Sequence, residues 1–263
     1  MKIGVLGCGY NCHEGLEERL NPWFNFAKEN NVVFSFVSAQ FLEYSKLGYD
    51  TKNNAETKAK ILELFLDGRI QHYYATETPQ SEANARNEAL RPLIEDCCDI
   101  IWLLDLSDEY YTESNIQKIY GHVFTAEDRI AWWSINFKNY IFDGKQWIDG
   151  FCPPRIFRNT IDYGDFRISS FYYDNDITYK YSRDSKIVIP YKYFPNEQIP
   201  KKLAHIKHMT WLHSNGKDKV KYQLAHFGHC SYKWNEEKNE LEFDLDFYRK
   251  NDMKLPIINK DES

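Results

Sequence analysis

The sequence feature that most constrains the fold is a run of five apolar residues, Ile100–Leu104, which ends directly in acidic residues. The run lacks the alternation of a half-exposed strand, so it predicts a strand that is buried on both faces of a helix-covered parallel sheet. Asp105, Asp108 and Glu109 follow it. Ligands of open α/β sheets bind at the carboxyl ends of strands, so we expect an exposed acidic site there.

The N-terminal half of the sequence alternates strand-like and helix-like segments. This alternation is typical of a parallel sheet whose strands are joined by crossover helices. The expected elements are strands at Ile3–Leu6 and Val32–Ser38 and helices at Pro22–Asn30, Asn54–Gly68 and Glu82–Cys98.

Local signals add detail to these helices. Ser81 is expected to cap the helix that follows it, and Pro92 to bend or restart that helix. Gly68 suits a left-handed C-terminal cap, and Thr112 is expected to cap a further helix. From about residue 127 onward the sequence has short, aromatic-rich, strand-like runs such as Trp132–Phe137. The second half is therefore expected to be less regular.

Composition narrows the class of protein. The 263 residues are 43% hydrophobic and 27% charged, which is typical of a compact globular chain. Apolar runs near 18 residues are absent, so we expect no transmembrane segment. The start of the sequence lacks a signal-peptide pattern, which predicts a cytoplasmic location. A net charge of -6 argues against a general nucleic-acid binder.

The first predicted strand leads into Gly7-Cys8-Gly9-Tyr10-Asn11-Cys12, which begins like the dinucleotide fingerprint G-x-G-x-x-G. Cys12 occupies the place of the third glycine, and the second strand ends without the acidic residue that would bind a ribose. A tight turn is therefore the better interpretation. A nicotinamide-dependent oxidoreductase remains a weaker alternative.

A basic segment near the C-terminus forms the next candidate site. Six lysines lie between Lys201 and Lys221. His205 and His208 would share one face if they were on a helix. Single histidines are more often structural than ligating, but this cluster favours an anion or metal site, since imidazole binds transition metals and ammonium groups bind phosphate. The sequence contains neither a nucleophile elbow nor a Walker loop.

Three segments, in this order, resemble those of nucleotide-sugar-dependent glycosyltransferases of the glycosyltransferase-A fold, in the family 2-like group. Ala83–Leu90 is similar to the helix that precedes the metal-binding strand. Ile100–Tyr111 is similar to the apolar strand with its acidic and aromatic residues. His208–His213, with Lys221, is similar to the closing segment.

The resemblance implies an α/β fold of the glycosyltransferase-A type, with a mixed, mostly parallel sheet flanked by helices and an aromatic-rich acceptor half. It implies one domain, residues 1–263, made of a nucleotide-sugar half (1–112), an acceptor and metal-closing half (113–230) and a C-terminal segment (231–263). The implied enzyme is a hexosyl- or pentosyltransferase that moves a sugar from a nucleoside-diphosphate sugar to an acceptor hydroxyl.

The resemblance also implies roles for particular residues. Asp105, Asp108 and His208 would hold Mn²⁺, or Mg²⁺, on the donor's phosphates, with Asp108 and Glu109 as catalytic residues. The donor-binding residues would be Gly7, Tyr10, Asn11, Arg86, Asn87, His213, Lys217 and Lys221.

Two departures from the family pattern matter. The acidic segment is one residue longer than D-x-D-E, so Asp108 is the safer metal ligand. His213 replaces the usual arginine, so Lys217, Lys221 or a protonated His213 would meet the pyrophosphate.

Several alternatives stay open. Asp149, Asp162 and Asp165 are candidates for the general base by chemistry alone. The acceptor is a glycan or, given the basic segment, a modified DNA base. The Asn-, Lys- and Tyr-rich composition hints at a bacterial or phage origin. A rival class is a non-catalytic module of the same fold that binds carbohydrate or nucleic acid.

Overall fold

The computed structural model describes residues 1–39, 42, 54–76, 78, 80–141, 145–150, 152–159, 165–168, 178–181, 188–190, 194–209 and 216–260. It divides into two compact units. The first contains Met1–Asn136 and Cys152–His205, and the second contains Phe137–Phe151 and Ile206–Ser263. The single domain with segment boundaries after residues 112 and 230 stays a prediction.

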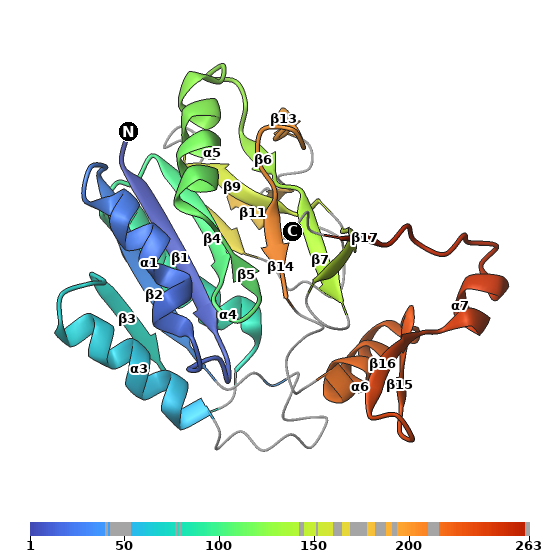
Figure 1. Ribbon diagram of the computed structural model, residues 1–263. Coiled ribbons are helices and arrows are strands. Elements are labelled where there is room, and N and C mark those ends of the chain that lie inside the picture. The colour runs from blue at the N-terminus through green and yellow to red at the C-terminus, as the bar shows by residue number, and fades with distance from the viewer. Residues whose placement is uncertain are drawn as a thin grey trace. The chain divides into compact units, whose positions relative to one another are not determined.

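The first unit is built on a seven-stranded sheet with the strand order β13-β6-β9-β4-β1-β2-β3 (Figure 1). Only β9 runs antiparallel to its neighbours β4 and β6, so the sheet is mixed and mostly parallel, as predicted. Its strands are β1 (Ile3–Gly9), β2 (Val32–Ser38), β3 (His72–Ala75), β4 (Ile100–Asp105), β6 (Trp132–Ser134), β9 (Pro154–Arg158) and β13 (Asn196–Gln198).

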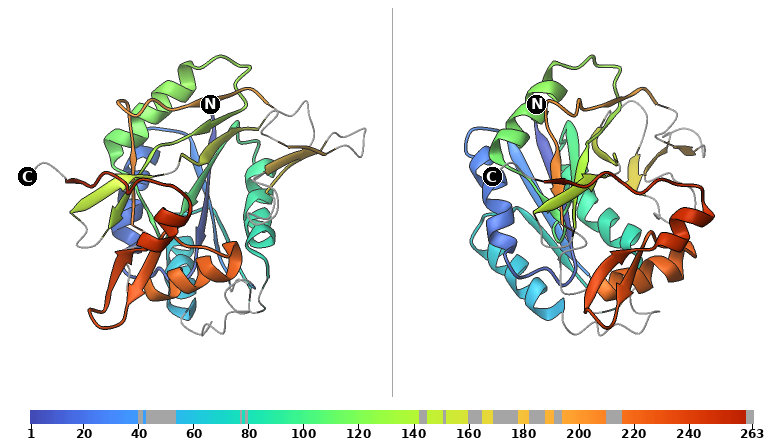
Figure 2. Two further views of the ribbon diagram at one scale, coloured as in Figure 1. Left: turned by 90° about the vertical axis from the view of Figure 1, so that its right-hand side faces the viewer. Right: turned by 45° about the vertical axis from the view of Figure 1, so that its right-hand side comes forward.

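Helices cover both faces of this sheet. The connections through α1 and α3 lead outward from β1 to β3, and right-handed crossovers place both helices on one face. The return connection through α4 places that helix on the other face. Figure 2 shows α1 and α5 on one side of the sheet and α4 on the opposite side. The helices are α1 (Leu16–Ala27), α3 (Asn54–Leu66), α4 (Glu82–Glu95) and α5 (Glu113–Thr125).

Most local signals acted as expected. The hydroxyl oxygens of Ser81 and Thr112 accept hydrogen bonds from the backbone nitrogens of Asn84 and Asn115, which caps α4 and α5. Gly68 has φ +71°, the left-handed conformation of a helix end. The expected restart at Pro92 is wrong, since α4 runs through it to Glu95. Pro92 removes one helical hydrogen bond in the last turn, but the helix continues through it.

The first helix differs most from its prediction. It was expected over Pro22–Asn30 but spans Leu16–Ala27, with Pro22 inside it. Leu16, Leu20 and Trp23 are buried on its inner face, and this packing extends the helix upstream of the proline. Tertiary burial therefore overrode the local breaker signal.

The first unit also contains shorter strands from the acidic segment and from the aromatic-rich second half of the sequence. The predicted run Trp132–Phe137 is divided between β6 and a strand of the second unit. The remaining elements are β5 (Glu109–Tyr110) and a three-stranded antiparallel sheet of β10 (Asp165–Ile168), β11 (Thr178–Tyr181) and β12 (Val188–Pro190).

The second unit contains its own sheet, in which β17, β8, β7 and β14 are neighbours. A helix and a hairpin, β15 with β16, pack around the buried residues Ile141, Val220 and Leu241. The elements are β7 (Phe137–Ile141), β8 (Gln146–Asp149), β14 (Ile206–His208), α6 (Gly216–Phe227), β15 (Tyr232–Asn235), β16 (Glu240–Phe243), α7 (Leu245–Lys250) and β17 (Asn259–Lys260).

The described helices of both units were compared with the length and apolarity that a membrane span requires. None of them meets both requirements.

Candidate functional site

The candidate site lies in the first unit, where β1 and β4 end side by side. Cys8 of β1 is in register with Asp105 of β4. The chain leads outward from β1 through β2 to β3 and then returns to place β4 on the other side of β1, so the strand order reverses between β1 and β4. This is a topological switch point, where open α/β sheets form a crevice for ligands. The glycines at the end of β1 and the first acid of the acidic segment, at the end of β4, therefore lie side by side at one edge of the sheet.

The two glycines at the end of β1, Gly7 and Gly9, are closely packed. A Cβ on Gly7 would lie 2.5 Å from the ring of buried Phe36, and one on Gly9 would lie 2.9 Å from the Sγ of Cys12. The backbone nitrogen of Cys12 donates to Thr57 Oγ1 at 2.8 Å. These contacts leave no room for side chains at the two glycines.

The loop between this turn and α1 does not have the form of a dinucleotide fingerprint. Asn11 has φ +49°, and its backbone nitrogen donates to Asn54 Oδ1 at 3.1 Å. Helix α1 begins only at Leu16, after a left-handed Gly15. The fingerprint instead needs a glycine turn that opens directly into a helix. Tyr10 is half-buried and packs against the core beneath the turn.

The acidic segment is more buried than the sequence suggested. Asp105 Oδ1 accepts hydrogen bonds from the backbone nitrogen of Ser107 at 3.0 Å and from its hydroxyl at 2.6 Å. Asp108 is only 5% exposed. The expectation that these carboxylates are exposed is therefore wrong for Asp108. Burial of a carboxylate is costly unless it is paired, so Asp108 is constrained by its surroundings.

Glu109 is the most enclosed of the three acids. Arg155 Nε donates to its Oε1 at 2.7 Å, and Tyr111 donates to its Oε2 at 3.2 Å. Trp102 Nε1 in turn donates to the Tyr111 hydroxyl at 3.4 Å. Burial raises the pKa of Glu109 to about 6, although the positive charge of Arg155 opposes this rise. Arg155 was not identified as a site residue from the sequence. The available signal was its positive charge within a short, mostly apolar strand.

Arg19 joins the two loops of the site. Its Nε donates to the carbonyl of Leu106 at 2.9 Å, and its Nη2 donates to the carbonyl of Cys12 at 2.6 Å. Its Nη1 donates to the carbonyl of Glu14 at 2.8 Å and to the hydroxyl of Tyr110 at 3.0 Å. One buried guanidinium thus fixes the loop after β1 against the acidic segment after β4. Nothing in the sequence pattern marked this arginine.

Arg86 approaches the same edge from α4. It is buried, and its Nη2 lies 2.5 Å from Glu82 Oε1. Burial disfavours its charge, but nearby Glu82 and Asp105 hold its pKa above the ordinary value. Its Nε has no hydrogen-bond partner among the described residues. A buried donor of this kind is costly to leave unpaired, which makes it suitable for a bound ligand. The next residue, Asn87, is half-buried.

The histidine cluster is arranged differently from the expectation. The shared face that a helix would give His205 and His208 does not arise, because Ile206–His208 forms β14. His208 Nδ1 lies 2.8 Å from Asn139 Oδ1, and its ring stacks on Phe137 at 5.0 Å between centroids. These contacts fix the ring within the second unit.

The two lysines assigned to the donor also belong to the second unit. Lys217 Nζ lies 2.6 Å from a carboxylate oxygen of Glu236, so it already has a charged partner. Lys221 is exposed on α6. His213 and Asp162 lie outside the described residues, and so does the side chain of Asp165. Asp149 is exposed at the end of β8.

A divalent ion in a protein needs several ligating side chains at one place, and the predicted metal ligands were examined for this. In the described part of the chain, no three His, Cys, Asp or Glu side chains gather as a set that could hold a metal. Glu109 is bound to Arg155, and one oxygen of Asp105 is bound to Ser107. The described residues thus do not fit a preformed metal centre, and the assignment of Asp105, Asp108 and His208 stays a prediction.

Comparisons with known proteins give distant structural similarity. No family model matches the chain, and no curated protein matches it. The crystal structure of S. aureus TarS 1-349 in complex with UDP-GlcNAc is 15% identical and covers 86% of this chain and 65% of that chain, with a TM-score of 0.45. The crystal structure of S. aureus TarS is also 15% identical and covers 86% and 39%, with a TM-score of 0.40. The chain spans less than two thirds of each TarS chain.

Proposed function

We propose that this protein is a glycosyltransferase that moves a sugar from a nucleoside-diphosphate sugar to an acceptor hydroxyl. The observation that carries the proposal is the pairing of Cys8 near the end of β1 with Asp105 at the end of β4, at the switch point of the sheet, with Asp108 three residues further on. Arg86 adds a buried donor without a partner at the same edge. Such convergence of polar groups in a crevice is typical of a ligand site.

The sequence resemblance supports the same function. Ala83–Leu90 falls on α4, and Ile100–Tyr111 forms β4, the acidic segment and β5. Helix α4 packs against β1 and β2, and β4 pairs with β1. Two segments that resemble a nucleotide-sugar site are therefore close together in the first unit. The third segment reaches residues outside the described part of the chain.

The proposed reaction exchanges one bond for another at the anomeric carbon. The bond from this carbon to the diphosphate breaks, and a bond to the acceptor oxygen forms. The acceptor hydroxyl loses its proton, and the nucleoside diphosphate leaves with the bonding electron pair. Asp149, Asp162 and Asp165 remain the candidates for the base. We propose no step through a metal ion, because the described residues do not fit one.

Different side chains at the sheet edge would make different contacts with the donor. Gly7 lets the backbone turn closely past the core, so that Tyr10, Asn11 and Asn87 can line the nucleotide pocket. Arg86 would donate to the donor through its Nε. We propose that Asp108 contacts the donor. Glu109 instead acts as a positioning residue, since Arg155 and Tyr111 engage both of its oxygens.

The finer assignments also belong to this proposal. A glycan is a better acceptor than DNA, because the chain carries a net charge of -6 and DNA binding requires a basic surface. Transfer of a hexose or pentose, a bacterial or phage origin and a cytoplasmic location are further parts of it. The rival function is a binding module without turnover, which would bind sugar or nucleotide and form no product.

Ligand-induced stabilisation tests the donor site. We expect at least one of UDP-glucose, UDP-N-acetylglucosamine and GDP-mannose to raise the melting temperature, since binding to the native state stabilises it. Arg86→Lys should weaken the shift. Arg91→Lys is the matched control, because Arg91 lies exposed on the same helix. Equal shifts in both variants, or a shift with NAD alone, would contradict the proposed donor site.

A further inference from the structure

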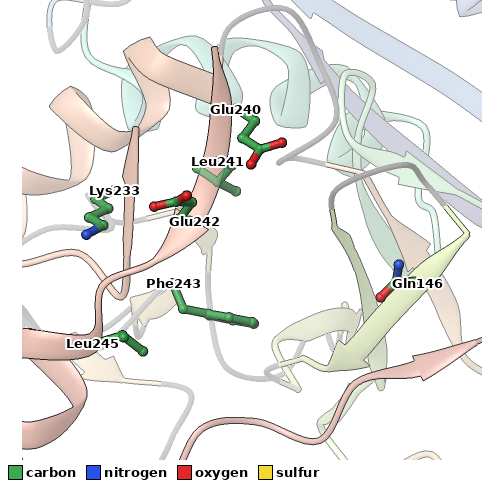
Figure 3. Close-up of a pocket in the computed structure, with 7 residues that line it drawn as sticks. All are labelled: Gln146, Lys233, Glu240, Leu241, Glu242, Phe243 and Leu245. Atoms are coloured by element: carbon green, nitrogen blue, oxygen red, sulfur yellow. The ribbon is translucent and has the colours of Figure 1, made fainter. Parts of the chain in front are cut away.

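A cavity lies wholly within the second unit. It has a volume of about 540 Å³, within the range of small-molecule sites. Its walls come from β8, β15, β16 and the start of α7. Figure 3 shows Gln146 of β8 on one side, and the hairpin residues and Leu245 on the other.

An apolar wall forms one side of the cavity. Leu241, Phe243 and Leu245 line it, and Figure 3 shows the Phe243 ring directed toward the strand that carries Gln146. The ring is fixed from behind, since it stacks on Tyr232 at 5.4 Å between centroids. It also meets the edge of Tyr248 at 6.0 Å. The cavity thus presents a rigid aromatic surface that is only partly buried.

The rim of the cavity carries hydrogen-bonding groups of balanced charge. Gln146, Lys233, Glu240 and Glu242 line it. Both glutamates are neighbours of Lys238, which lies outside the lining and has its Nζ 2.7 Å from Glu242 Oε1 and 3.7 Å from Glu240 Oε1. This arrangement provides no excess positive charge for a phosphate or a nucleic acid, which bind to basic surfaces.

We propose that this cavity binds a neutral saccharide. A sugar ring has an apolar face of C–H groups, which fits against an aromatic ring, and a rim of hydroxyls, which exchange hydrogen bonds with carboxylate, amide and ammonium groups. The Phe243 ring and the Gln146 amide present these two kinds of surface to the cavity. Under the proposed function, on which this reading of its purpose rests, the saccharide is part of the acceptor glycan.

Binding of defined oligosaccharides to the full chain tests the inference. The probes are cellotetraose, maltotetraose and chitotetraose, each at up to about 10 mM. Saturation-transfer NMR and calorimetry measure their binding. At least one should bind. Phe243→Ala should weaken binding about tenfold, because it removes the aromatic surface. Gln146→Ala should weaken binding severalfold. Because this variant leaves the packed hairpin unchanged, it still tests the inference if Phe243→Ala unfolds.

A matched control and a rival probe complete the experiment. Phe124→Ala removes an exposed phenylalanine from the first unit and should leave affinity unchanged. Binding of none of the three probes, or equal affinity in the wild type, Phe243→Ala and Gln146→Ala, would overturn the inference. Binding of duplex DNA that is lost in Phe243→Ala would also overturn it. Saccharide binding is measured without a nucleotide sugar, so a chain that binds the saccharide but forms no glycosylated product would contradict the proposed function and not this inference.

Discussion

Arg155 and Glu109 form an ion pair that is almost completely removed from water. Both Nε and Nη2 of the arginine lie 2.7 Å from Glu109 Oε1, and the two side chains are 8% and 0% exposed. Arg155 comes from β9, the reversed strand beside β4, and Glu109 begins β5 directly after the acidic segment. The pair therefore fixes the end of the acidic segment to the neighbouring strand.

Removal of one partner should destabilise the protein strongly. Arg155→Ala leaves the Glu109 carboxylate buried without its cation, and we expect a loss of about 3–5 kcal/mol in the free energy of unfolding. The double variant Glu109→Gln/Arg155→Met removes both charges and should lose clearly less. Urea unfolding of the wild type and both variants measures this. A single variant as stable as the wild type would contradict the buried pair.

The same carboxyl group should make stability depend on pH. The pKa of Glu109 rises from 4.5 to about 6 on folding, so the folded state binds more protons between these values. Stability from this group is present below about pH 4.5 and is lost as the pH rises through about 6, by about 2 kcal/mol in total. The wild type should therefore lose more stability across this window than the Glu109→Gln/Arg155→Met variant. Parallel profiles would contradict the shift.

Arg19 should hold the two loops of the candidate site together. Arg19→Ala leaves the carbonyls of Cys12 and Leu106 without their donor, and we expect a loss of about 3 kcal/mol in stability together with weaker nucleotide-sugar binding. Arg249→Ala, which removes an exposed arginine from α7, is the control and should change neither. Chemical unfolding and calorimetry measure the two effects. Intact donor binding in a folded Arg19→Ala variant would show that the bridge has no part in the site.

The fold was largely predictable because its parallel half follows local rules. Val32–Ser38 is mostly apolar and Ile100–Leu104 wholly so, and both became interior strands of the sheet. Ser81 and Thr112 cap their helices as their positions indicated. Periodicity and capping act within a few residues, so a sequence pattern contains them.

The candidate site was predictable only in part, because its stabilising contacts join residues far apart in the sequence. Arg155 meets Glu109 across 46 positions, and Arg19 meets Leu106 across 87. No local pattern encodes such pairs. The spacing of His205 and His208 left their secondary structure open, and strand pairing with β7 determined that of His208. Tertiary pairing overrides local propensity in short segments of this kind.

The two glycines Gly7 and Gly121 offer a matched test of the packed turn. Gly7→Ala would place a Cβ 2.5 Å from the buried Phe36 ring and should destabilise the protein by about 1–3 kcal/mol. Gly121→Ala in α5 meets no atom within 4 Å and should stabilise it by about 0.5–1 kcal/mol. Thermal unfolding measures both. Equal effects would contradict the tight packing at the glycine turn.

Product formation tests the central claim most directly. The full chain is incubated with a nucleoside-diphosphate sugar and a neutral oligosaccharide, and mass spectrometry follows the glycan while released nucleoside diphosphate is measured. We predict a glycan heavier by one sugar unit and an equal amount of nucleoside diphosphate, with a loss of about 100-fold or more in Asp108→Asn. Asp67→Asn, on the exposed surface, should keep full activity. Donor binding without any glycosylated product, or equal turnover in Asp108→Asn, would contradict the account.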